Sequence, residues 1–360
     1  MLQHCLLRDF LSYKRKCLLR KQGGGYSVSA EIIDVIYRFC GFPVFKTFKY
    51  KKLNNKTPYL RQNYLLSLGL CKMSDSELFE KTQNLCKNMD SKSKQIVHRI
   101  ISRTKEAELS PTNKVFCLTQ DEREKLEYIH NDYRANICKV TSNIFCYQDY
   151  FLPIKHFETS VFCYKHGLDT FSPQTLQKIK NLDIIDVGGF VGDSALIFQH
   201  FTDKNIYSFE ATNRSYNLML ESIRLNHAQR IVPIKKALGS EHTTMTINIY
   251  GSASSLINDM GNDKEEVEII TLDSYVNEHQ LKIGLIKVDI EGFEMEFLKG
   301  AKETICQQKP AMILSIYHQA SDFFDIKPLL ESWNLNYTFR VYKPIDDNIS
   351  LETTLMCEIL

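Results

Sequence analysis

From residue 183 onward, short apolar runs typical of β-strands alternate with segments long enough to form helices. The runs occupy residues 184–187, 205–210, 231–234, 245–250, 285–289, 311–316, 337–341 and 355–360. Strands that alternate with helices need crossover connections, so they favour a mostly parallel sheet with helices on both faces. We therefore expect a doubly wound α/β domain, with the last two strands as an antiparallel C-terminal edge.

The preceding part of the chain predicts a different organisation. Residues of about 74–135 contain few Gly or Pro and carry apolar residues at helical spacing, and Pro111 divides them into at least two helices. The aromatic stretch 143–162 is typical of a loop, whereas Ser172-Pro173 predicts a helix with Ser172 as N-cap. We divide the chain into a basic N-terminal segment that is a small hairpin or partly flexible (1–60), a mainly helical N-terminal region (61–160) and the α/β domain (161–360).

Charge and cysteine usage bear on the location and partners of the protein. The formal charge of the 360 residues is +2, but residues 1–60 hold twelve Lys/Arg against three Asp/Glu. Aromatics alternate with lysines in 39–52, a pattern that could contact an anionic membrane surface, a partner enzyme or nucleic acid. We favour a packed hairpin with solvated lysines and expect no nucleic-acid partner. The eleven cysteines form no C-x-x-C pair and no apolar run approaches the ~20 residues of a membrane span, so we expect a cytoplasmic protein.

A glycine-rich turn follows the first strand of the α/β domain, where such sheets bind ligands. It reads Asp186-Val-Gly188-Gly189-Phe-Val-Gly192-Asp193-Ser194. This spacing differs from the G-x-G-x-x-G of dinucleotide-binding folds, and an ordinary tight turn is the alternative interpretation. The carboxylates of Asp186 and Asp193 would repel a pyrophosphate but suit a ligand with a sulfonium and an ammonium group. The turn therefore favours S-adenosylmethionine over NAD.

Charged residues also end the later strands. Glu210 closes the next strand about 20 positions beyond the glycines, where a carboxylate can accept both ribose hydroxyls. Lys287, Asp289 and Glu291 would share one face of the strand at 285–289, where buried charges need partners and suggest a site. His318 follows the apolar strand at 311–316 as a candidate base. Each feature has an alternative interpretation. Glu210 could be a solvated strand end, the charged residues 287, 289 and 291 could form an internal ion pair, and His318 could be structural.

Several strings, in this order, resemble the FkbM-type methyltransferase family over residues of about 160–345. The string Lys-x-Asp-x-Glu-Gly-x-Glu at 287–294 is the most specific to the family, and Gly189 stands where we would expect Ala. The full set comprises the glycine turn 186–194, Tyr207-Ser-Phe-Glu210, Thr271-Leu-Asp273-Ser-Tyr, 286–294, Leu298-Lys-Gly300-Ala and Ile316-Tyr-His318.

The resemblance implies a Rossmann-like class I methyltransferase that transfers a methyl group from S-adenosylmethionine to a hydroxyl of a sugar or small natural product. The stretch 41–46 resembles segments of bacterial surface-glycan enzymes and favours a glycan acceptor. The cofactor residues would be Asp186, Gly188, Gly189, Gly192, Asp193, Ser194 and, for the ribose, Glu210. The acceptor side would comprise the catalytic candidates Asp289, His318 and Lys287 and the substrate-binding candidates Glu291, Glu294 and Tyr317.

Four questions about mechanism stay open at this point. The base is Asp289 or His318, with Lys287 holding the carboxylates. A Mg²⁺ ion held by Asp289 and Glu291 is an alternative that we do not favour, and we expect no metal site. A non-catalytic scaffold of a glycan-assembly complex would keep the same fold. The hydroxyl-rich loop 251–255 is a further candidate for contact with a polar ligand.

Overall fold

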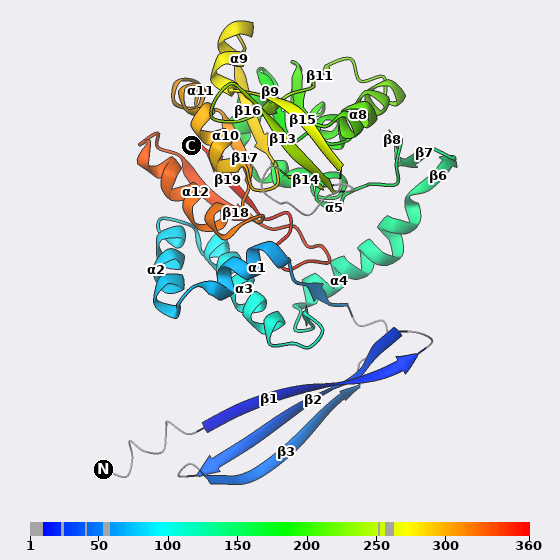
Figure 1. Cartoon of the computed structure of the whole chain (residues 1–360), viewed down its shortest axis with the longest axis vertical. Coiled ribbons are helices and arrows are strands. Elements are labelled where there is room, and N and C mark those ends of the chain that lie inside the picture. Colours follow the sequence, from blue (N-terminus) through cyan, green and yellow to red (C-terminus); the bar gives the residue numbers. More distant parts are fainter. Residues whose placement is uncertain (1–9, 23–24, 40–41, 53–57, 251–252, 256–262) are drawn as a thin grey trace.

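The computed structural model of the chain describes residues 10–22, 25–39, 42–52, 58–250, 253–255 and 263–360. Its centre is a seven-stranded sheet in the C-terminal domain (Figure 1). The strand order is β11 (Ile231–Ile234), β10 (Ile206–Phe209), β9 (Asp183–Val187), β16 (Ile283–Val288), β17 (Ala311–Ser315), β19 (Thr354–Glu358) and β18 (Thr338–Tyr342).

The pairing of these strands confirms the predicted mostly parallel sheet with an antiparallel C-terminal edge. β11, β10, β9, β16 and β17 pair in parallel, whereas β19 pairs antiparallel with both β17 and β18. β19 is inserted between β17 and β18, so the outermost strand is β18. The order reverses between β9 and β16, and ligands of such sheets bind beside that reversal.

Both faces of the sheet are buried, as expected for a doubly wound fold. Consecutive residues of β9 and β16 serve opposite sides, because side chains alternate along a strand. Ile185 and Ile286 belong to one apolar core, whereas Ile184 and Leu285 belong to the core on the other face. The helices of this domain are α6 (Pro173–Lys180), α7 (Asp193–Phe198), α8 (Asn213–Leu225), α9 (Leu272–His279), α10 (Glu294–Gly300), α11 (Lys302–Gln308) and α12 (Ala320–Ser332).

The predicted start of α6 is confirmed. The Ser172 hydroxyl accepts a hydrogen bond from the Thr175 N–H at 3.2 Å, and Pro173 occupies the first turn. Pro has no N–H to leave unsatisfied there, and the Ser oxygen satisfies one of the free donors of the helix end.

The run at 245–250 does not join the central sheet. It lies in β13 (Thr243–Tyr250) of a second sheet with the order β12 (Ala237–Leu238), β15 (Asp263–Ile270), β13 and β14 (Ala253–Ser255). β15 escaped prediction because it contains three glutamates, Glu265, Glu266 and Glu268, which conceal an apolar face formed by Val267 and Ile269. The alternation of charged and buried residues identifies a strand with one solvated face.

Helices dominate residues 64–136, as predicted. They are α1 (Tyr64–Lys72), α2 (Asp75–Cys86), α3 (Ser91–Glu108), α4 (Gln120–Tyr128), a π-helical turn (Ile129–Tyr133) and a 3₁₀ turn (Arg134–Asn136). Pro111 lies between α3 and α4. None of the helices in the described part of the chain is both long and apolar enough to cross a bilayer.

The prediction of a loop at 143–162 is wrong. A three-stranded antiparallel sheet, β6 (Cys138–Thr141), β7 (Ile144–Tyr147) and β8 (Tyr150–Leu152), precedes α5 (Thr159–Phe162) and the 3₁₀ segment Lys165–Thr170. Aromatic residues such as Phe145 and Tyr147 favour strands, and the non-glycine Gln148 makes the turn with a φ of 52°. The short pair β4 (Leu60–Arg61) and β5 (Lys114–Val115) and the meander β1 (Phe10–Gln22), β2 (Gly25–Phe39) and β3 (Phe42–Lys52) complete the strands.

The N-terminal helices cover the C-terminal edge of the central sheet (Figure 1). The Ser93 hydroxyl at the start of α3 accepts a hydrogen bond from the Val341 N–H of β18 at 3.0 Å. Asn63, the N-cap of α1, donates its side-chain N–H to the carbonyl of Tyr317 at 2.8 Å. The helical region is therefore hydrogen-bonded to the domain on which it packs.

Candidate functional site

The glycine turn follows β9 and is held against two neighbouring strands. Gly188 and Gly189 donate their N–H groups to the carbonyl of Phe209 at 3.0 and 2.8 Å. Gly188 has a φ of 79°, and a Cβ there would lie 1.9 Å from the carbonyl oxygen of Asp289. Gly192 has a φ of 83° and is the N-cap residue that precedes α7. Only glycine fits the position of Gly188, because both its conformation and its neighbour exclude a side chain.

Glu210 links the end of β10 to this turn. Its carboxylate accepts hydrogen bonds from the Phe190 N–H at 3.0 Å and from the N–H and hydroxyl of Thr212 at 2.8 and 2.7 Å. Burial raises the pKa of Glu210, and these donors and Lys287 act against that rise. The carboxylate is thus fixed beside the turn, in the position expected of a residue that binds a ribose.

Asp186 lies behind the turn rather than in front of it. It is completely buried, accepts a hydrogen bond from the Ser208 hydroxyl at 2.7 Å and lies 3.3 Å from the amine of Lys287. Lys287 also donates to the carbonyl of Gly188 at 2.9 Å. Burial lowers the pKa of this lysine, but Asp186, Asp289 and Asp193 outweigh burial and raise it, so the amine stays protonated.

Asp289 follows β16 and shares one phenol with a second carboxylate. The Tyr317 hydroxyl is 2.9 Å from Asp289 Oδ1 and 3.2 Å from Glu352 Oε1. Burial raises the pKa of Asp289, but Lys287, His318 and the Tyr317 hydroxyl together lower it below its ordinary value. Asp289 is therefore a carboxylate at neutral pH.

His318 lies behind Asp289 among three carboxylates. Its Nδ1 is 2.9 Å from Glu294 Oε1, and its Nε2 is 3.3 Å from Asp289 and 3.7 Å from Glu291. Burial lowers the pKa of His318, yet Glu294, Asp289 and Glu291 raise it to about 10. The ring is an imidazolium at neutral pH, so it has no free nitrogen to accept a proton.

The start of α7 contributes Asp193 and Ser194. Burial and the charge of Glu158 raise the pKa of Asp193. The Ser194 hydroxyl lies 2.8 Å from His166 Nε2. Burial and Lys287 lower the pKa of His166 to about 3, so this ring is neutral.

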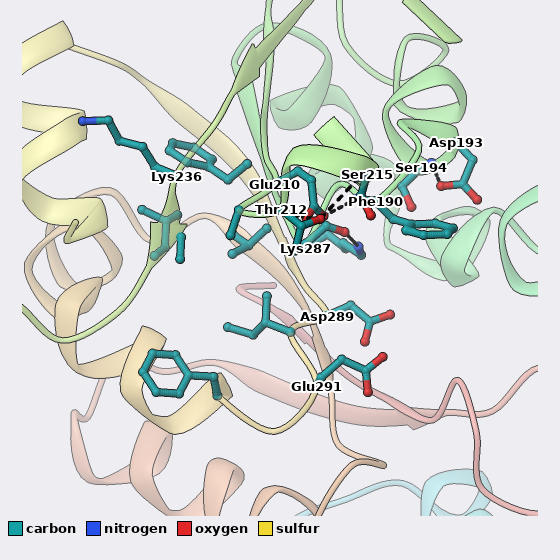
Figure 2. Close-up of a pocket in the computed structure, with 18 of the residues that line it drawn as sticks. Phe190, Asp193, Ser194, Glu210, Thr212, Ser215, Lys236, Lys287, Asp289 and Glu291 are labelled. Atoms are coloured by element: carbon teal, nitrogen blue, oxygen red, sulfur yellow. Dashed lines mark hydrogen bonds between the residues drawn. The ribbon is translucent and has the colours of Figure 1, made fainter. Parts of the chain in front are cut away.

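These groups meet in one cavity of about 210 Å³ beside the carboxyl ends of β9, β10 and β16. Figure 2 shows Glu210, Lys287, Asp289 and Glu291 around it. Of the predicted site residues, those that line the cavity are Gly188, Asp193, Ser194, Glu210, Lys287, Asp289, Glu291 and Tyr317. The others, Asp186, Gly189, Gly192, Glu294 and His318, lie behind this wall and support it. Glu291 reaches the cavity from a turn with a φ of 57° rather than from the strand face.

The residues of this wall that sequence reasoning missed include four polar residues distant from any motif and the apolar half of the wall. The polar residues are His156, Glu158, His166 and Glu352, and the apolar half is formed mainly by Leu238, Ile247, Val267, Phe209 and Phe293. The polar four stand singly in segments far from any motif, so only the fold brings them together. The apolar residues come mostly from the second sheet and offer a surface for a planar ring. Gly251 and Ser252 of the candidate loop lie outside the described residues.

One group in the described part of the chain has the geometry of a metal site. Ligand atoms of Asp289, Glu294 and His318 lie within 4.8 Å of one another. Magnesium prefers oxygen ligands, whereas one of these three groups is an imidazole nitrogen.

Comparisons with known proteins agree with this geometry. Residues 186–341 match the methyltransferase FkbM domain family. These residues are therefore similar to FkbM-type methyltransferase domains. A protein named Methyltransferase 1 from Beauveria bassiana is 21% identical over 174 residues, which cover 41% of this chain and 70% of that protein. Both comparisons thus relate the C-terminal domain to methyltransferases.

Two solved structures with low identity were also found. The methyltransferase FkbM of Methylobacillus flagellatus is 18% identical with a TM-score of 0.49, and the match covers 78% of this chain and 58% of that one. This chain thus spans less than two thirds of that structure. A Streptococcus mutans protein in complex with SAH is 11% identical with a TM-score of 0.33, and the match covers 51% and 92% of the two chains.

The departure of the FkbM-type turn at Gly189 has a local cause. A Cβ at this position would lie 2.2 Å from the Ser208 hydroxyl, which is itself bonded to Asp186. The Ser208 hydroxyl therefore occupies the space that an alanine at 189 would need.

Proposed function

We propose that this protein is an O-methyltransferase that transfers a methyl group from S-adenosylmethionine to a hydroxyl of a sugar, in bacterial surface-glycan biosynthesis in the cytoplasm. The observation that carries the proposal is the continuous cavity between the glycine turn and the carboxylates around Asp289. The donor supplies a methyl group activated by a positively charged sulfur. The protein has to hold that donor, align the hydroxyl and remove its proton.

The donor side of the cavity suits S-adenosylmethionine in charge and shape. Glu210 is fixed where a carboxylate accepts ribose hydroxyls, and the apolar wall with Leu238 and Phe293 suits an adenine ring. Asp193 and the turn at Gly188 lie on the side left for the ammonium and the sulfonium. Carboxylates in this position support a cationic sulfur donor over a dinucleotide.

On the acceptor side, we assign the role of base to Asp289 rather than to His318. Asp289 lines the cavity and is ionised, whereas His318 is buried behind it and protonated. The hydroxyl proton moves to Asp289 as the acceptor oxygen takes the methyl group, and the carbon–sulfur bond of the donor breaks to leave S-adenosylhomocysteine. Lys287, His318 and the Tyr317 hydroxyl keep Asp289 ionised and oriented before that step.

Calorimetry followed by mass spectrometry tests the proposal. The full-length protein should bind S-adenosylmethionine and not NAD, because the turn has the wrong spacing and charge for a pyrophosphate. Incubation with nucleotide sugars and surface oligosaccharides should then add the mass of one methyl group to an acceptor. If the protein binds neither S-adenosylmethionine nor NAD, it is a scaffold that retains the fold. Methylation of a nitrogen or carbon atom instead of an oxygen would contradict the assigned chemistry.

A further inference from the structure

We infer that the acceptor subsite is the wall formed by Glu158, Asp289 and Glu352, and that it takes a neutral or amino-substituted sugar and rejects an acidic one. The inference rests on the proposed function and deepens it by naming the charge class of the acceptor. Two of these three carboxylates lie outside residues 186–341, so the family match does not assign them.

The fold brings three separate segments to this wall. Glu158 precedes α5 as its N-cap residue, and Glu352 lies in the connection between β18 and β19 with a φ of 60°. Both line the same cavity as Gly188 and Glu210. The Tyr317 hydroxyl lies within hydrogen-bonding distance of Glu352 and Asp289, at 3.2 and 2.9 Å, so it joins the newly recognised carboxylate to the proposed base.

Carboxylates outnumber cations on the cavity wall. Six line it, namely Glu158, Asp193, Glu210, Asp289, Glu291 and Glu352. The lysines that line it are Lys236 and Lys287, and each also pairs with a carboxylate that does not line the cavity. Lys236 lies 2.6 Å from Glu268, and Lys287 lies 3.3 Å from Asp186. Figure 2 also shows Lys236 far from Asp289, on the opposite side of the pocket.

Imidazoles offset only part of this charge. His156 lies 2.9 Å from Glu158, and His318 shares its proton among Asp289, Glu291 and the buried Glu294. The proximity of these carboxylates affects Glu352. Burial raises the pKa of its carboxyl well above the ordinary value, and Glu158 and Asp289 raise it further. A carboxylate on the acceptor would add another like charge to this group, whereas hydroxyls and an ammonium would donate to it.

The wall also offers an apolar surface to a sugar ring. Phe190 lines the cavity with a φ of 43°, and its ring meets His156 edge-on at 5.0 Å between centroids. Figure 2 shows the Phe190 side chain on the side of the pocket to which Asp289 and Glu291 point. An aromatic face beside carboxylate acceptors is suited to a ring with apolar C–H faces and a rim of hydroxyl donors.

Three sugars with the same ring test the inference: glucosamine, glucose and glucuronate. Each is titrated by calorimetry into the full-length protein saturated with S-adenosylhomocysteine at pH 7. We expect glucosamine to bind about tenfold more tightly than glucuronate, with glucose between them, because one charge interaction near a protein surface is worth at least that factor. The S-adenosylhomocysteine titration, performed first, reports on the donor site alone.

Variants locate the effect on the wall. Glu158→Gln should reduce the preference for glucosamine over glucuronate by about threefold, since it removes one charge and keeps the shape of the side chain. Glu352→Gln should reduce the preference less at pH 7 than at higher pH, because the raised pKa of Glu352 keeps its carboxyl partly protonated. Glu303→Gln on the exposed surface of α11 is the matched control and should change nothing. All three variants should bind S-adenosylhomocysteine as the unaltered protein does, which also shows that they are folded.

The outcomes separate this inference from the proposed function. If S-adenosylhomocysteine fails to bind, the proposed function falls and this inference with it. If it binds but glucuronate binds as well as glucosamine, or none of the three sugars binds, the charge class is wrong while the donor site stands. A preference that both glutamine variants leave unchanged would place the acceptor elsewhere in the cavity.

Discussion

The two sides of the cavity differ in how the chain builds them. The donor side consists of a continuous turn, 186–194, and Glu210, which is hydrogen-bonded back to that turn. The acceptor side is assembled from three residues that are far apart in the sequence: Glu158 lies 131 positions before Asp289, and Glu352 lies 63 positions after it. A local motif thus specifies the donor, whereas the acceptor depends on how distant segments pack. Changes on one side should leave the other side largely intact.

The largest effect should come from the acceptor side. Asp289→Asn removes the group that takes the proton, so kcat should fall by about 10²–10⁴-fold. The affinity for S-adenosylmethionine should change by less than about threefold. Steady-state kinetics and calorimetry measure the two quantities. Asp325→Asn, at a surface ion pair on α12, is the matched control. Full turnover by the Asp289 variant would remove this residue from the role of base.

On the donor side, Glu210→Ala should weaken the binding of S-adenosylmethionine by about a hundredfold. The carboxylate is lost as a ribose acceptor, and each charged hydrogen bond is worth about 1.5–3 kcal/mol. Calorimetry with the donor measures the change, and Glu303→Ala on exposed α11 serves as the control. Unchanged donor affinity would contradict the assignment of Glu210 to the ribose.

The free energy of unfolding should depend on pH, because the His318 ring behind the acceptor side is charged in the folded protein. The pKa of His318 is raised to about 10, against about 6.5 in an unfolded chain. Its contribution to stability is therefore complete below about pH 6.5 and is lost as pH rises through 10. Denaturant unfolding of the protein and of His318→Gln should show a difference of a few kcal/mol at pH 6 that shrinks at pH 10. A difference that grows with pH would show that the ring is neutral when folded.

The glycine turn can be tested by restoring the residue expected in the family. Gly189→Ala should destabilise the fold by about 1–3 kcal/mol, because its Cβ would meet the Ser208 hydroxyl at 2.2 Å. Ser208→Ala makes room but gives up the bond to Asp186, so the double variant should be more stable than the sum of the two single effects by about 1 kcal/mol. Additive effects in denaturant unfolding would show that the two positions do not compete for space.

The smallest effect should be that of Tyr317→Phe. Loss of the hydroxyl removes a donor shared by Asp289 and Glu352, and the pKa of Asp289 should rise. We expect kcat/KM for the acceptor to fall about fivefold, with donor affinity unchanged. A loss of donor binding instead would show that the two sides are coupled through this phenol.

The sequence allows the central sheet and the donor side to be predicted because their signals are local. Apolar runs predict the strands, and Gly188 needs a conformation that glycine favours. Short stretches of sequence are therefore enough to predict both features. Glu158 and Glu352 carry no such signal, since each is one charged residue in an irregular segment. β15 was missed for a related reason, because its glutamates interrupt the apolar run.

Two of the predicted site residues do not reach the cavity in the folded protein. Asp186 lies at the end of a strand, where contact with a ligand was expected. Inside the domain, however, its carboxylate accepts a hydrogen bond from Ser208 and forms an ion pair with Lys287. His318 is likewise one layer behind the cavity. Sequence spacing gives the end of the sheet at which a residue lies, but the depth of a side chain depends on packing across strands.

The hydrogen bond from Asn63 to the Tyr317 carbonyl has a practical consequence for anyone who trims this protein. A fragment cut to residues 186–341 would lose that anchor together with Glu158, His156 and Glu352. Such a fragment would contain the glycine turn, but it would lack most of β9 and the whole of β19, which lies inside the central sheet. Versions shortened this far are therefore expected to lose the sheet that holds both sides of the cavity.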